Sequence, residues 1–145
     1  MSKFIYKFEP VIRVKEVFEK KISKEIALIE KEIEQTIIKK SNIIGNMKEL
    51  HLKINSGHIK VAEYKSSYAH LRNMEKEVNN LEKKIIELKQ RKEVKLEELL
   101  QRKKEKKVFE KLKEIKLEEY SIDNNREDMV QLNEVAINNF IRRDT

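Results

Sequence analysis

The most constraining feature of this sequence is an unbroken heptad row of apolar residues in its middle third. The six positions of the row are separated by alternating steps of three and four residues: Leu71, Met74, Val78, Leu81, Ile85 and Leu88. This spacing places all six side chains on one narrow stripe of an α-helix, as in the seam of a coiled coil. Because such a helix is stable in water only when a partner covers its stripe, the row predicts a long helix packed on another.

A second apolar row lies earlier in the chain and supplies the expected partner. After Pro10, apolar residues recur in steps that are nearly all threes and fours: Val11, Val14, Phe18, Ile22, Ile26, Ile29, Ile33, Ile37, Ile44 and Met47. The polar cluster "NSGH" at residues 55–58 separates the two rows and is typical of a turn. We therefore predict an all-α fold, a long antiparallel two-helix coiled-coil hairpin with an overhanging C-terminal helix.

The few helix breakers set the expected boundaries. The 145 residues include only two Gly and one Pro, and Pro10 suits the first turn of a helix. The polar cluster "YSIDNNRED" from Tyr120 could end one helix and cap the next. We expect a single elongated coiled-coil domain over residues 1–145, with helix 1 at about 10–53, a turn at about 54–58, helix 2 at about 59–120 and a short C-terminal helix at about 126–142.

The stretch "LLQRKKEKKVF" marks a gap in the apolar seam, because seven residues without a hydrophobic side chain separate Leu100 from Val108. With the turn near Ser56, residue i should face about residue 112 − i, which places Pro10 opposite about residue 102. The gap would then lie beyond the end of helix 1, where no seam has to be filled. We expect the second helix to continue past its partner at this point.

Positive charge concentrates in this gap and in the residues that follow it. Residues 101–116 carry eight Lys or Arg and three Glu, so they hold +5 of the net charge of +7. Three interpretations stay open: nucleic-acid binding, a solvated helix face with Glu and Lys at i, i+4, and a basic surface that binds an acidic surface of another protein. Nucleic acid is disfavoured because the segment lacks an interleaved set of aromatic residues and a recognisable groove-entering module.

Catalysis and metal binding find no support in the residue pattern. The chain has no Cys, and its three histidines, His51, His58 and His70, lack the spacing of metal ligands. Gly45 and Gly57 are isolated, so no glycine-rich phosphate loop exists, and a two-helix rod offers no concave pocket. We predict a non-enzymatic protein with no catalytic residues, no metal and no cofactor.

The longest apolar run also excludes a membrane span. Residues 26–29 form this run, which is far shorter than the about 20 residues that cross a bilayer. The N-terminus alternates apolar and charged residues and lacks the hydrophobic block of a secretory signal. We expect a soluble cytoplasmic protein with no transmembrane segment.

Four stretches, in this order, carry a resemblance to a known family. The opening "KFIYKFEPVIRVKEVFEKK" alternates aromatic residues before it enters a helix, and "AEYKSSYAHL" begins the second helix. "VFEKLKEIKLEEY" is similar to a long exposed segment of that family, and "NREDMVQLNEVAINNFIRR" is similar to its C-terminal helix. Together they resemble the flagellar export protein FliJ family over nearly the whole chain. One departure is Asn133, which stands where the family usually has Asp.

The resemblance implies a component of the flagellar type III export apparatus. It implies a coiled coil that inserts in the hexameric flagellar export ATPase ring, promotes ring assembly, links the ring to the membrane export gate protein and escorts export chaperones. The implied location is cytoplasmic, peripheral to the cytoplasmic membrane at the flagellar base. A virulence-type secretion stalk, a basic coiled coil that binds nucleic acid and a generic structural coiled coil stay open as alternatives.

Two sets of site residues follow from the resemblance. The open end of the hairpin is expected to contact the ATPase ring through Phe4, Phe8, Val11, Ile12, Arg13, Lys15, Leu132, Glu134 and Phe140. The export gate is expected to contact the residues near the turn, Tyr64, Tyr68 and Leu71. The alternative for the first set is that its aromatics cap the open end, and for the second that it packs in the seam.

Overall fold

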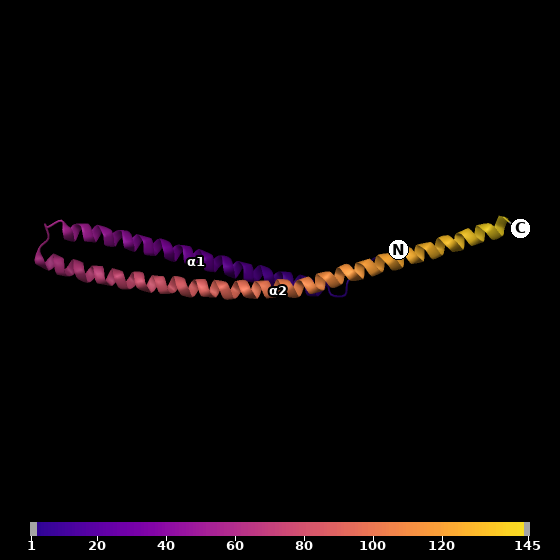
Figure 1. The fold of residues 1–145 in the computed structure, drawn as a ribbon, viewed down its shortest axis with the longest axis horizontal. Coiled ribbons are helices and arrows are strands. Elements are labelled where there is room, and N and C mark those ends of the chain that lie inside the picture. Colours follow the sequence, from indigo (N-terminus) through magenta and orange to yellow (C-terminus); the bar gives the residue numbers. More distant parts are fainter. Residues whose placement is uncertain (1–2, 144–145) are drawn as a thin grey trace. The chain divides into compact units, whose positions relative to one another are not determined.

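The computed structural model describes residues 3–143, which form two long helices. Helix α1 spans Glu9–Asn55, helix α2 spans Val61–Arg143, and no strand occurs in the described part of the chain. The two helices pack against each other and are joined by residues 56–60 (Figure 1). The predicted all-α helical hairpin is therefore confirmed.

The contacts of the chain group into two compact units, where the sequence led us to expect a single domain. We call residues 20–100 the hairpin unit, and residues 3–19 with 101–143 the terminal unit. The hairpin unit contains most of α1, the turn and the first half of α2. The two units are described separately below.

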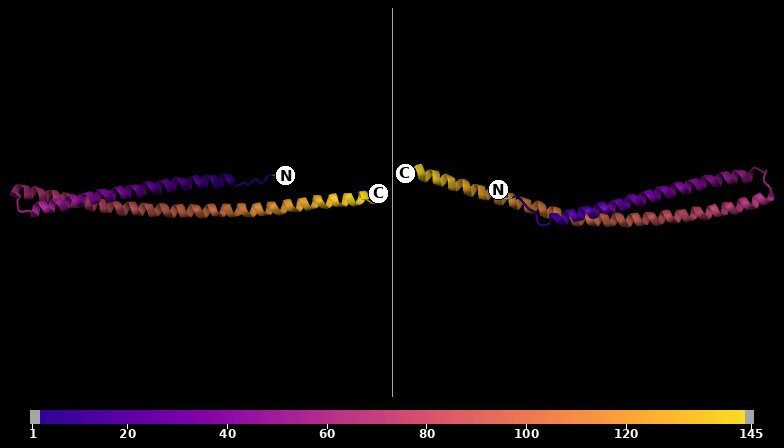
Figure 2. Two further views of the ribbon diagram at one scale, coloured as in Figure 1. Left: turned by 90° about the horizontal axis from the view of Figure 1, so that it is seen from above. Right: turned by 180° about the vertical axis from the view of Figure 1, so that it is seen from behind.

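The core of the hairpin unit is a seam one side chain deep. Ile22 and Ile26 of α1 are buried together with four members of the heptad row, Leu71, Leu81, Ile85 and Leu88. Two further views show α1 and α2 of this unit side by side (Figure 2). Each buried aliphatic side chain stabilises the fold by about 1.5 to 3 kcal/mol.

Thr36 is a buried polar residue within this apolar seam. Its hydroxyl donates a hydrogen bond to the carbonyl oxygen of Glu32 at 2.7 Å, one turn earlier in α1. The hydroxyl is thus satisfied within its own helix and needs no partner from α2.

Ion pairs across the seam fix the register of the hairpin unit. Three join a glutamate of α1 to a lysine of α2, and the shortest is Glu25 to Lys95 at 2.8 Å. The hydrogen bond from Lys95 lowers the pKa of Glu25. A fourth pair has the opposite polarity and joins Lys40 to Glu82 at 3.1 Å. Such partly exposed pairs add little stability, but they favour one alignment of the helices.

This register differs from the predicted one. The rule of 112 − i placed Glu25 opposite about residue 87, whereas it pairs with Lys95. The reason is that α1 continues to Asn55 and α2 begins only at Val61, so the turn lies later in the chain than expected. The prediction that α2 outruns its partner near residue 101 is therefore wrong.

The turn itself is built by residues that end α1. Ser56 donates hydrogen bonds to the carbonyl oxygen of Lys53 from its backbone N–H at 3.4 Å and from its hydroxyl at 2.7 Å. Gly57 follows with a φ of 76°, a conformation that glycine adopts without a Cβ clash. Together they cap the C-terminal carbonyls of α1 and redirect the chain.

The expected break between residues 120 and 126 is absent, because α2 is continuous from Val61 to Arg143. Ser, Asp and Asn in a helix interior cost only some tenths of a kcal/mol each relative to Ala. Neither Gly nor Pro occurs after Gly57, so nothing in this stretch forces the backbone to leave the helix. The separate C-terminal helix at about 126–142 is therefore corrected to the last part of α2.

None of the helices in residues 3–143 combines the length and the apolarity that spanning a membrane requires.

Replacing each of the two glycines by alanine should change the free energy of unfolding in opposite directions. A Cβ at Gly45, inside α1, would meet no heavy atom within 4 Å, so Gly45→Ala should raise the free energy of unfolding by about 0.5 to 1 kcal/mol through helix propensity. Gly57→Ala should lower it by about 1 kcal/mol, because alanine is strained at a positive φ. Urea unfolding followed by circular dichroism measures both, and equal effects of the two variants would contradict this account.

Candidate functional site

The N-terminal segment, residues 3–8, packs along α2 within the terminal unit. Its rings meet those of α2 in two places, Phe4 against Tyr120 with centroids 5.4 Å apart and Phe8 against Phe109 at 5.7 Å. Between them Tyr6 is buried, and its hydroxyl donates a 2.8 Å hydrogen bond to the carbonyl oxygen of Phe109. We call these five residues the aromatic clasp.

Backbone hydrogen bonds tie the aromatic clasp to the start of α1. The N–H of Glu9 donates to the carbonyl oxygen of Tyr6 at 3.2 Å, and the N–H of Ile12 donates to that of Phe8 at 3.1 Å. Two donors of the first helical turn are thereby satisfied. The segment 3–8 consequently extends the cover on α2 beyond the first residue of α1.

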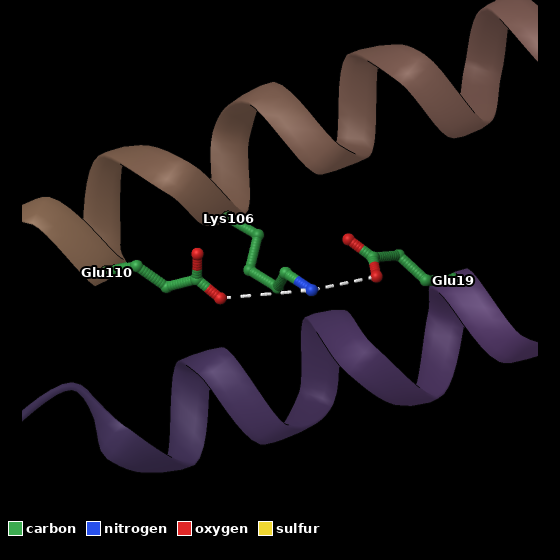
Figure 3. Close-up of polar contacts among 3 residues, drawn as sticks. All are labelled: Glu19, Lys106 and Glu110. Carbon is green, nitrogen blue, oxygen red and sulfur yellow. Dashed lines mark hydrogen bonds and ion pairs between the residues drawn. The ribbon is translucent and has the colours of Figure 1, made fainter.

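Charged side chains fill the gap that the sequence shows in the apolar seam. Lys106 of α2 lies between two carboxylates, with its Nζ 2.9 Å from Glu19 Oε2 and 3.8 Å from Glu110 Oε1 (Figure 3). The side chains of Lys106 and Glu19 are only 18% and 13% exposed. The hydrogen bond to Glu19 raises the pKa of Lys106. The gap therefore lies opposite α1, and it is polar because its inward residue, Lys106, is paired.

Further cations of the terminal unit pair with carboxylates or rings. Lys113 Nζ lies 2.7 Å from Glu9 Oε2, and Lys15 Nζ lies 3.3 Å from Glu105 Oε2. Lys15 also sits 5.4 Å from the ring centroid of Phe109. These contacts surround the aromatic clasp with positive charge that is partly neutralised, an arrangement suited to an interface rather than to proton transfer.

The predicted ATPase-binding residues do not form one surface. Phe4, Phe8, Val11 and Lys15 are half-buried near the aromatic clasp, Ile12 is buried and Arg13 is exposed. Leu132, Glu134 and Phe140 are exposed in the last part of α2. At 1.5 Å per residue, Phe140 lies about 30 Å along the helix from Tyr120. The expectation of a single open-end surface is therefore replaced by two surfaces.

We call residues 123–143 the tail of α2. The tail exposes seven large apolar side chains: Met129, Val130, Leu132, Val135, Ile137, Phe140 and Ile141. Polar residues at helical spacing, such as Gln131 and Asn138, occupy another face. Exposed apolar side chains that gather on one helix mark an interaction surface.

The three predicted gate residues have different environments. Tyr64 and Tyr68 are exposed in the first turns of α2, and their ring centroids are 4.8 Å apart. A hydrogen bond between the two hydroxyl-bearing side chains raises the pKa of Tyr64. Leu71 is only 4% exposed and belongs to the core seam. The tyrosine pair is thus the accessible part of this set.

A groove of about 450 Å³ borders the aromatic clasp and is lined by Phe4, Tyr6, Phe8, Leu112 and Tyr120 with Lys3, Ile5, Lys7 and Lys116. Among the described residues, no group of three or more His, Asp or Glu side chains gathers where a metal ion could be held. The groove suits the docking of an apolar side chain from a partner.

In a comparison with protein-family models, residues 3–145 match the model described as flagellar FliJ protein. This chain belongs to the FliJ family. Membership implies a structural component of flagellar export. Searches among curated proteins and among solved structures found no match to the chain.

Three residues of the aromatic clasp in this FliJ-family chain were not predicted as site residues: Tyr6, Phe109 and Tyr120. A signal for them exists in the sequence, because Phe109 and Tyr120 are eleven residues apart and therefore share one helix face. Tyr6 also continues the alternation of aromatics between Phe4 and Phe8. What the sequence lacked was the register that places this face beneath the N-terminal segment.

Replacing Lys106 should destabilise the FliJ-family chain in a pH-dependent way. Lys106→Met leaves the Glu19 carboxylate largely buried without its cation, which should lower the free energy of unfolding by about 2 kcal/mol at pH 7. Because the pKa of Lys106 is raised, its stabilisation is complete below its ordinary value of 10.5 and is lost as pH rises through the folded value. Unfolding of both proteins between pH 7 and 11 tests this.

The matched control is Lys84→Met, which removes a lysine from a pair whose side chains are about half exposed. It should cost less than about 1 kcal/mol. A difference between wild type and Lys106→Met that stays constant up to pH 11 would refute the assigned role of the Glu19 pair.

Proposed function

We propose that this chain is the stalk of the flagellar type III export apparatus, which inserts in the hexameric export ATPase ring and promotes ring assembly. The observation that carries the proposal is the tail of α2, which exposes seven large apolar side chains on a helix of a FliJ-family protein. A helix with such a face lies in an apolar groove when it binds a partner. The ring is the partner that the family resemblance implies.

The dimensions of the tail fit this role. Its 21 residues correspond to about 30 Å of helix, which is long enough to enter a protein ring deeply. Its apolar face supplies contact area, while Glu134 and the polar residues of the other face keep it compatible with a hydrated channel. The ring would cover side chains that otherwise stay in water.

The aromatic clasp is proposed as the second contact with the ring. Phe4 and Phe8 border the groove of about 450 Å³, and the exposed Arg13 lines a second groove that also borders Phe4. Aromatic side chains and arginine are enriched among residues that dominate binding energy. Ile12 would support this contact from below, because it is buried, while Val11 and Lys15, half-buried like Phe4 and Phe8, would lie at its edge.

The tyrosine pair is proposed as the contact with the membrane export gate protein. Tyr64 and Tyr68 form an exposed pair of rings, and the apolar side chains of Leu52 and Val61 are also exposed at this end of the hairpin unit. Leu71 would hold the pair in place from the seam. Escort of export chaperones and a location at the cytoplasmic side of the flagellar base complete the proposal.

The ATPase contact is tested by truncating the tail face. Leu132→Ala with Phe140→Ala should raise the chain concentration needed for half-maximal ATPase stimulation at least about tenfold, because two exposed anchors of the interface are lost. The measurement is ATP turnover and ring assembly of a hexameric export ATPase titrated with the chain. Adding Phe8→Ala should weaken stimulation further.

Gln131→Ala with Asn138→Ala is the matched control, since both residues are exposed on the polar face of the same tail. This control variant should stimulate the ATPase to the same extent as the wild type. Unchanged stimulation by the Leu132 and Phe140 variant, with its helix content intact, would refute the tail as the contact with the ring.

The gate contact is tested separately. Tyr64→Ala with Tyr68→Ala should abolish capture of the export gate protein in a pull-down and leave ATPase stimulation unchanged, because both rings are exposed. Tyr64→Phe with Tyr68→Phe keeps both rings and should retain capture. Full capture by the alanine variant would remove the tyrosine pair from the proposal.

A further inference from the structure

Four lysines of the terminal unit form a ridge on α2. Lys103, Lys104, Lys107 and Lys111 are exposed, and no carboxylate of the described residues lies within ion-pair distance of any of them. Lys106, in the same stretch, is paired with Glu19 of α1. The basic interval therefore divides into an inner lysine that is neutralised and an outer ridge that is not.

Helix geometry places this ridge on the outer side of α2. At 3.6 residues per turn, the four lysines fall within about 100° of the helix circumference. Phe109 and Lys106, which contact the N-terminal segment and α1, lie on the other side of the helix. The ridge thus points away from everything that the terminal unit packs against α2.

A second apolar row begins beside the C-terminal part of the ridge and continues beyond it, where Glu114 and Glu118 replace the lysines. Val108, Ile115 and Ile122 recur at intervals of seven residues and are 66%, 52% and 46% exposed. A heptad interval keeps side chains in line on a helix that is paired with another. We call these three residues and the four lysines the outer face of α2.

We propose that the outer face binds an acidic amphipathic helix of a partner protein as a third helix beside α2. Val108, Ile115 and Ile122 would pack against a heptad row of the partner, and the lysine ridge would pair with carboxylates at the end of this row that meets Val108. This inference goes beyond the proposed function, because the outer face shares no residue with the aromatic clasp, the tail or the tyrosine pair. Of the three interpretations of the basic residues 101–116, it favours binding to an acidic protein surface.

The placement of the aromatic residues disfavours nucleic acid as the occupant. Single-stranded nucleic acid binds where aromatic rings are available for base stacking beside the basic groups. The two rings of this part of α2, Phe109 and Tyr120, are engaged in the aromatic clasp. The outer face offers only aliphatic side chains between its lysines.

The same composition disfavours an anionic membrane. Helices that lie on a bilayer combine lysines with bulky Trp, Phe or Leu side chains that enter the headgroup region. The apolar members of the outer face are three isolated β-branched residues, which fit the spaced pockets of a facing helix better than a lipid surface. Nucleic acid and membrane are therefore outcomes that the test must distinguish.

The test uses the full chain and a fluorescent synthetic peptide of three heptads, with Leu at its a and d positions and Glu at its flanking positions. Fluorescence anisotropy should show binding at least about tenfold tighter than that of a scrambled peptide of the same composition or a 20-nucleotide thymidine oligomer, and binding should weaken as salt rises. Lys104→Glu with Lys107→Glu and Lys111→Glu should weaken it at least about tenfold. Val108→Ser with Ile115→Ser, which changes no charge, should also weaken it.

The matched control reverses three exposed lysines of α1, Lys20, Lys24 and Lys31, and changes the net charge equally. It should bind the peptide like the wild type. Equal weakening by the control, binding that ignores the serine substitutions, or equally tight and ridge-dependent binding of the oligonucleotide or of phosphatidylglycerol vesicles would overturn the proposal. Because these variants leave the tail unchanged, ATPase stimulation reports separately on the proposed function.

Discussion

The mutual burial of two narrow apolar stripes is the interaction on which this structure depends. In the hairpin unit, buried Ile and Leu side chains of α1 and α2 cover one another, and no other layer exists to cover them. All remaining faces are available for charge, which explains why 41% of the residues are charged in a folded chain. The ion pairs beside the seam, such as Glu25 with Lys95, then align the helices rather than hold them together.

In the terminal unit, the inner side of α2 is covered by different side chains. Here an extended segment replaces a helix, and rings replace aliphatic side chains, so that Tyr6 and Phe8 cover the part of α2 around Phe109. The inward lysine, Lys106, is retained because Glu19 and Glu110 neutralise it. Lysines without such partners are displaced to the outer face, where water or a partner can solvate them.

The sequence predicted the helical hairpin because its two heptad rows are long and regular, and regular periodicity is the strongest local signal. It did not predict the register, since the polar cluster at the turn allows the reversal to shift by several residues. The expected break near Asp123 failed because polar residues cap a helix only where the backbone already leaves it. The aromatic clasp depends on a contact between Tyr6 and Phe109, 103 residues apart, which no local pattern encodes.

A seam that repeats every seven residues also constrains how the hairpin unit can change its size in evolution. Adding or removing one heptad in each helix keeps every stripe aligned and alters the length in steps of about 10 Å. An insertion of any other size turns the following stripe away from its partner, as a stutter does in a coiled coil. Relatives built on this plan should therefore differ in span by whole repeats, so that reach is adjusted in increments while the packing geometry stays constant.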